Sequence, residues 1–171
     1  MSGFMFGGSA LTLDIGVVNA TGAAVTEGMV LAIELDSATA ANNDGFRAKI
    51  PVKADGNPEM FVACHGAALV PSGQSIPDGE NVIVRVVGPC KVRVDAASPN
   101  VALGDVLIIA NGSTDLKKPA ALPALAAAAS GSYAQAQIQS LLDMHAVKAV
   151  SRQSPSATTD NTLIDAWMKG L

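Results

Sequence analysis

The strongest constraint on the fold is the segment 82–95, in which valines alternate with other side chains on both sides of a Gly-Pro pair. In its second half, Val92 and Val94 would lie on one face of a strand and the charged residues between them on the other. β-branched residues at this density favour strand over helix. The pattern predicts two strands, 82–87 and 90–95, as the clearest strand pair in the chain.

Similar runs recur along most of the sequence. Short apolar or alternating segments are separated by turns rich in Gly, Asn, Asp and Pro, which is typical of strands. Further strands are expected at residues 13–17, 29–35, 46–52, 61–70, 106–110, 146–152 and 163–168. We therefore predict a mainly β fold, a small barrel or sandwich of about 8–10 short strands.

Residues 120–143 depart from this pattern because they are rich in alanine. Ile138, Leu141 and Leu142 follow the i, i+3, i+4 spacing of one helix face. This spacing predicts one inserted short helix at about 133–143, preceded by an Ala-rich connector.

The first 12 residues are glycine-rich and carry no charged side chain, but they include Phe4, Met5 and Phe6. Such a terminus is usually mobile unless it docks on something. We predict an extended N-terminal arm over 1–12, followed by a single β-barrel domain over 13–171 that contains the insertion 120–143. The three apolar side chains are candidate partner-binding residues.

One internal similarity links two distant segments. Residues 25–33 and 101–109 are identical at five of nine aligned positions, including one glycine. A glycine turn that leads into a buried strand is common, so shared turn chemistry or chance explains much of the match. Two copies also fall short of a solenoid, which needs at least three stacked units.

Composition excludes several classes of protein. The formal charge is −4 and no basic run exceeds two residues, which argues against binding nucleic acid through phosphate contacts. Hydrophobic residues make up 49% of the chain, which argues against intrinsic disorder. The N-terminus lacks the basic and apolar regions of a secretory signal. The uncharged segment 119–142 contains Pro, Gly, Ser and Gln, so it is a poor membrane span.

The reactive residue types do not form a recognisable catalytic pattern. Cys64 and Cys90 are too few for a disulfide framework, and buried reduced thiols are expected, with a single bridge as the alternative. His65 follows Cys64 directly, and neighbours on a strand point to opposite faces. Neither His65 nor His145 has a partner at metal-ligand spacing. We expect no enzyme activity, no metal site and no cofactor.

Trp167 is the only tryptophan. On a strand over 163–168 it would share one face with Leu163 and Asp165, while the opposite face is wholly apolar. Tryptophan is common both in cores and at interfaces, so both roles are open here. Trp167 is the fourth candidate partner-binding residue.

Several segments resemble, in order, those of bacteriophage capsid decoration (cement) proteins of the small β-barrel type. They are residues 25–31, 76–86, 101–112, 146–150 and 163–167. The resemblance implies a virion protein, made in the host cytoplasm, that binds the outer surface of an icosahedral head. It implies the major capsid protein and further copies of this chain, in a homotrimer, as partners. Such proteins bridge adjacent capsomers and help the shell resist the pressure of packaged DNA.

Three other functions are compatible with a small β fold. The first is another virion component, such as a tail or fibre-base domain. The second is a ligand-binding or carrier barrel, which would need a lysine presented on a tight hairpin, and Lys91 is the nearest candidate. The third is a small-barrel hydrolase, for which the sequence offers no set of acid, base and nucleophile.

Overall fold

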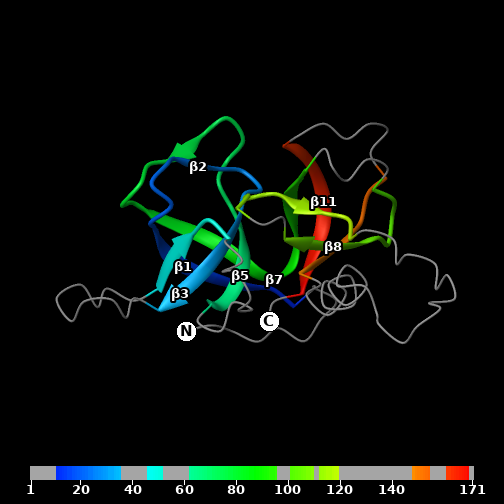
Figure 1. Cartoon of the computed structure of the whole chain (residues 1–171), viewed down its shortest axis with the longest axis horizontal. Coiled ribbons are helices and arrows are strands. Elements are labelled where there is room, and N and C mark those ends of the chain that lie inside the picture. Colours follow the sequence, from blue (N-terminus) through cyan, green and yellow to red (C-terminus); the bar gives the residue numbers. More distant parts are fainter. Residues whose placement is uncertain are drawn as a thin grey trace, which may run out of the picture.

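The computed structural model describes residues 11–35, 46–51, 62–95, 101–109, 112–119, 148–154 and 161–169. Over these residues the chain forms eleven strands, and the mainly β fold is confirmed (Figure 1). The strands are β1 (Leu13–Asn19), β2 (Val25–Thr26), β3 (Val30–Leu35), β4 (Phe46–Lys49), β5 (Val62–Ala68), β6 (Ser75–Ile76), β7 (Asn81–Val94), β8 (Val106–Ile109), β9 (Leu116–Lys117), β10 (Ala149–Ser151) and β11 (Thr162–Lys169). The predicted helix at 133–143 and residues 1–10 of the predicted arm lie outside the described residues.

The strand pairing closes two five-stranded rings that share β7. The first ring runs β1-β4-β3-β5-β7 and closes because β7 also pairs with β1. The second runs β7-β11-β10-β8-β9 and closes because β9 pairs back to β7. In Figure 1 the first barrel lies on the left and the second on the right, and β2 and β6 form a separate two-stranded ribbon.

Each barrel encloses its own hydrophobic core. The interior of a five-stranded ring is narrow, so it is filled mainly by valine, alanine, leucine and isoleucine, which explains the scarcity of aromatic residues. The first core contains Val17, Val25, Leu31, Ile33, Ala48, Cys64, Ala68, Val70, Val82, Val84 and Val86. The second contains Val92, Val94, Val101, Leu107, Ile109, Leu116, Ala149, Ile164, Ala166 and Met168, together with Val30 and Ala67 of the first barrel's strands.

The second barrel repeats the first, strand for strand. The end of β7 corresponds to β1, β8 to β3, β9 to β4, β10 to β5, and β11 to the start of β7. The order around the ring is the same in both barrels. Every pairing keeps its direction, including the parallel pair in each ring, which is β1–β4 in the first and β7–β9 in the second. The similar segments 25–33 and 101–109 occupy equivalent positions, so their similarity reflects a repeated barrel and not turn chemistry alone.

Hydrogen bonds at the turn before β3 recur at the turn before β8. The Gly28 N–H donates to the Ala68 carbonyl at 3.2 Å, and the Gly104 N–H donates to the Ser151 carbonyl at 2.9 Å. The reciprocal bond, from the N–H of Ala68 or Ser151 back to the turn, measures 2.8 Å in both barrels. The repeat therefore extends to the register of individual bonds.

The predicted strand pair around Gly88 is wrong, because 81–94 forms one continuous strand of 14 residues. Gly88 has φ +113°, and the register between β1 and β7 shifts nearby, between Leu13 and Asp14. A bulge of this kind bends a strand without reversing it. The first half of β7 pairs with β1 and the second half with β11, so the bend carries the chain from one barrel into the next.

Candidate interaction surface

Neither cysteine is a ready nucleophile. Both are free, with Cys64 buried in the first core and Cys90 half-buried. Burial raises the pKa of the Cys64 thiol, and burial raises the pKa of Cys90 to about 12 despite the nearby Arg85 guanidinium. Thiols with raised pKa values stay protonated at neutral pH and react slowly. The prediction of buried reduced thiols holds fully for Cys64 and in part for Cys90.

Among the described residues, we also looked for a metal site and for a ligand pocket. The described residues contain no group of three or more His, Cys, Asp and Glu side chains that could hold a metal ion. An open pocket of about 310 Å³ is lined by Pro89, Cys90, Lys91, Arg152, Asp165 and Ala166. Lys91 lies within strand β7 and not on a hairpin tip, and its ammonium pairs with Glu27 at 3.3 Å. It is therefore not presented as a carrier lysine would be.

No helix in the described part of the chain is long and apolar enough to cross a membrane.

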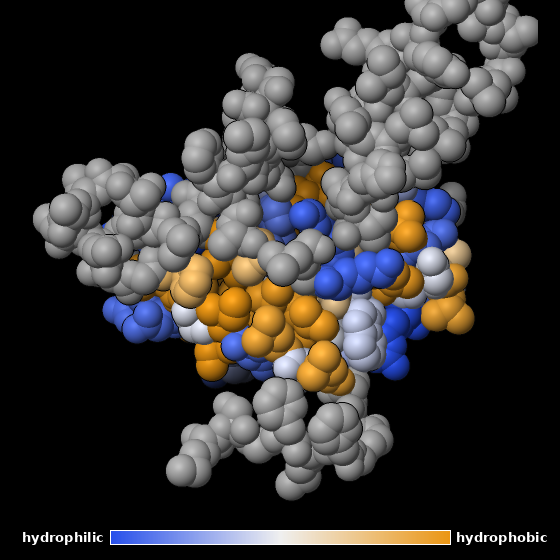
Figure 2. Space-filling model, turned by 90° about the horizontal axis from the view of Figure 1, so that it is seen from below, coloured by the Kyte–Doolittle hydropathy of each residue, from blue (hydrophilic) through white to orange (hydrophobic). Residues whose placement is uncertain are grey.

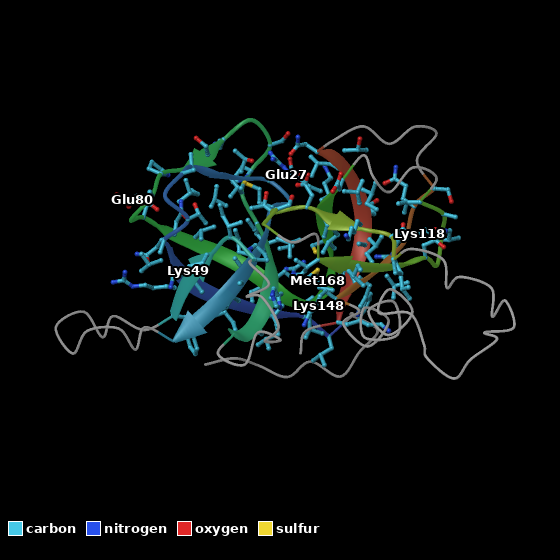
Figure 3. All side chains as sticks on the ribbon, in the orientation of Figure 1. Glu27, Lys49, Glu80, Lys118, Lys148 and Met168 are labelled. Atoms are coloured by element: carbon cyan, nitrogen blue, oxygen red, sulfur yellow. The ribbon has the colours of Figure 1, made fainter. Side chains whose placement is uncertain are left out.

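The best-defined contact surface is the junction between the two barrels. The β2–β3 turn of the first barrel rests on β7 of the second, where the Arg93 N–H donates to the Gly28 carbonyl at 2.8 Å. The Arg93 guanidinium also donates to the Glu27 carbonyl at 3.1 Å and to the Thr26 hydroxyl. Glu27, between the barrels in Figure 3, completes the junction through its ion pair with Lys91.

The outer face of the first barrel is covered at this junction. Val30 and Ala67 are paired across β3 and β5, point out of the first ring, have no exposed surface and pack with the second core. The Val30 N–H donates to the Thr114 carbonyl of the second barrel at 2.7 Å. Beside Ala67, Arg85 forms a two-pronged ion pair with Asp14, with both N–O distances at 2.8 Å.

The equivalent face of the second barrel is open. Val106, Val150 and Trp167 are in register across β8, β10 and β11 and point out of the ring. Val106 is 36% exposed, Val150 and Trp167 are half-buried, and Leu103 on the preceding turn is 70% exposed. We name Leu103, Val106, Val150 and Trp167 the open face. Hydrophobic side chains also reach the surface in the view of Figure 2, with hydrophilic ones around them.

The predicted alternation around Trp167 is confirmed. Trp167 points outward on β11 and belongs to neither core cluster, whereas the three residues that alternate with it are fully buried in the second barrel: Ile164, Ala166 and Met168. Phe4, Met5 and Phe6 lie outside the described residues. The other three members of the open face, Leu103, Val106 and Val150, were not predicted from the sequence. Aligning the two similar segments would have found Val106, because it aligns with Val30.

The turn that carries Leu103 is fixed by Asp105. Its carboxylate accepts hydrogen bonds from the Ala102 N–H and from the Lys118 ammonium, both at 2.7 Å. Lys118 lies on the second barrel, on the side away from the first (Figure 3). Burial acts to raise the pKa of Asp105, but these two hydrogen bonds and the positive charge of Lys118 together outweigh it and hold the pKa below the ordinary 3.8.

Replacing Asp105 by asparagine should therefore destabilise the protein in a pH-dependent way. Because the folded-state pKa is lowered, the ionised carboxylate stabilises the fold above the unfolded-state pKa, and this contribution is lost as pH falls through the folded pKa. We expect Asp105→Asn to lower the Tm by about 2–4 °C at pH 7, from a loss of roughly 1 kcal/mol. The difference should shrink toward zero at pH 2 in thermal melts. Parallel pH profiles of the two proteins would contradict this role of Asp105.

Comparisons with known proteins leave the chain without a family assignment. No protein-family model matches it, and no curated protein matches it in sequence. Among solved structures, it is similar to the N base of the head fiber gp8.5 of bacteriophage phi29, with a TM-score of 0.46 and 11% sequence identity. The alignment covers 93% of this chain and 95% of that chain. At this level of similarity the architecture rests on the strand pairing of the chain itself.

Proposed function

We propose that this chain is a structural protein of a bacteriophage virion, which binds the outer surface of the icosahedral head and cements adjacent capsomers. It acts as a homotrimer and contacts the major capsid protein. The observation that carries the proposal is the open face, which is apolar and partly exposed although its counterpart on the first barrel is buried under protein. A surface of this kind serves binding between proteins.

Two further observations support this function. The segments that resemble cement proteins overlap parts of β3, β7, β8, β10 and β11, which build the two barrels and their junction. The shared strand β7 also joins the barrels through backbone hydrogen bonds, which suits a component that must transmit load without separating.

The direct test is the location of the chain in infected-cell lysate. After density-gradient separation, mass spectrometry should find it with DNA-filled heads, at a fixed ratio to the major shell protein. Recovery with tails or detached fibres would replace the cement function by the tail or fibre-base alternative. Recovery only in the soluble fraction would contradict both.

Deleting residues 2–10 should weaken binding to heads and leave the fold intact. Burying Phe4, Met5 and Phe6 on the shell would contribute about 1.5–3 kcal/mol each, which exceeds the cost of about 1–2 kcal/mol for ordering the backbone of each of these three residues. Both barrels are built from β1 onward, which begins at Leu13, so the free variant should keep its Tm. Occupancy on purified heads, titrated against the full-length chain, checks the prediction. Unchanged occupancy would exclude this role for the arm.

A further inference from the structure

The internal repeat leaves one contact surface without a counterpart. Within the chain, the outer face and turn of the first barrel rest on the second barrel. The second barrel has the same outer face and turn, but no third barrel follows in the described chain. The surface that could receive this open face is therefore the part of the first barrel that is equivalent to the receiving part of the second.

Strand register identifies the receiving surface. Gly16 of β1 pairs with Ile83 of β7 in the first barrel, as Lys91 of β7 pairs with Asp165 of β11 in the second. Gly16 is thus equivalent to Lys91, and Val18, two residues further, is equivalent to Arg93. We name Gly16, Val18 and Ile83 the receiving face.

The receiving face is accessible in the isolated chain. Gly16 is exposed, and a Cβ added there would have no atom within 4 Å. Val18 is half-buried, and Ile83 is 56% exposed. An exposed isoleucine beside an exposed glycine on neighbouring strands forms an apolar surface with free space above the glycine, suited to accept an apolar side chain.

The two surfaces match residue by residue. Inside the chain, one polar pair joins Glu27 to Lys91. Leu103 and Gly16 occupy the equivalent positions, so a large apolar side chain would face a residue that has none.

A second pair changes in the same way. The hydrogen bond from Arg93 to the Thr26 hydroxyl holds the internal junction. At the equivalent positions stand Val18 and Ala102, which are both apolar. In both pairs the two partners lose their polarity together, which is expected if these residues also meet, but between separate chains.

We propose that the open face of one chain docks on the receiving face of a second copy, so that the contact between barrels within a chain is repeated between chains. The Leu103 turn then lies against Gly16 and Val18 of the neighbour. This contact is heterologous, joining two different surfaces, and it produces a cyclic trimer where the rotation between neighbouring chains closes after three contacts. The inference rests on the self-association in the proposed function and names the surfaces that produce it.

A charge swap tests the contact. Leu103→Glu and Gly16→Lys should each raise the dissociation constant of the purified full-length assembly at least tenfold, because each buries an unpaired charge. The double variant L103E/G16K recreates between chains the pair that Glu27 and Lys91 form within one. It should return the constant to within about threefold of the original value. Sedimentation velocity over a range of concentrations measures all four proteins.

Two controls keep the test decisive. Lys49→Glu changes an exposed residue of β4 outside both faces and should leave the mass of the assembly in sedimentation velocity unchanged. Circular dichroism should show that the single variants fold, since Leu103 is exposed and the space around Gly16 is open. A monomeric wild-type chain at about 100 μM, or no recovery in the double variant, would overturn the proposal. A chain that is monomeric in solution but bands with heads would refute this contact alone, and an assembling chain absent from virions would refute the proposed function alone.

Discussion

Replacing Gly28 by alanine is expected to destabilise the protein by about 3 kcal/mol or more, whereas the same change at Gly104 should cost only about 1–2 kcal/mol. The two glycines occupy equivalent turns and both have left-handed backbones, with φ +75° and +88°. The backbone strain of an alanine is therefore similar at both positions. What differs is the space around the new methyl group.

At Gly28 an added Cβ would lie 2.4 Å from Leu163 Cδ2 and 3.2 Å from the Arg93 backbone nitrogen. The leucine methyl can move, but the nitrogen belongs to β7 and donates to the Gly28 carbonyl across the junction. At Gly104 no atom lies within 4 Å of the added Cβ. The extra cost at Gly28 therefore measures how closely the two barrels approach each other.

Urea unfolding of both variants gives this difference directly. Combining Gly28→Ala with Leu163→Ala removes the mobile part of the clash, so part of the lost stability should return. Equal destabilisation at the two glycines would mean that the turn before β3 is not seated on the second barrel as described.

Strand positions could be predicted from the sequence because period-two alternation is a local property. The six longer strands outside β7 and the short β10 were all anticipated within a few residues. The two-residue strands β2, β6 and β9 were missed because a pair of residues has no period. The single strand β7 was missed because Gly88 and Pro89 are typical of a turn, and only the partners β1 and β11 decide whether the chain reverses there.

The candidate site was harder to predict because exposure is a tertiary property. Val30 and Val106 are the same residue in equivalent strands, yet one is fully buried and the other 36% exposed. No local pattern distinguishes them, since the difference lies in the second barrel covering only the first. The outward position of Trp167 could be predicted because its strand neighbours alternate cleanly, and its role in partner binding stays a prediction. The arm residues lie outside the described part of the chain, so their role stays a prediction.

Replacing Asn19 by aspartate should cost about 3–5 kcal/mol at pH 7, although the two side chains have nearly the same shape. Asn19 is fully buried at the end of β1. Its amide nitrogen donates to the carbonyls of Ala23, Ile76 and Pro77 at 2.8, 3.1 and 3.0 Å. Its oxygen accepts from the Thr21 N–H and hydroxyl. An aspartate would turn an oxygen toward three carbonyl oxygens and bring a charge out of water.

The pH dependence separates this electrostatic cause from a general loss of packing. Burial and the facing carbonyls should raise the folded-state pKa of the new carboxyl, so the folded variant holds its proton more tightly than the unfolded chain does. Stability then falls as pH rises above the unfolded-state value of about 3.9, and the cost should be clearly smaller at pH 3 than at pH 7. Asn81→Asp makes the same chemical change at an exposed position on β7 and should cost less than about 0.5 kcal/mol. Denaturant unfolding at the two pH values measures both variants. A pH-independent loss at Asn19 would show that the carbonyl cluster does not recognise the amide as a donor.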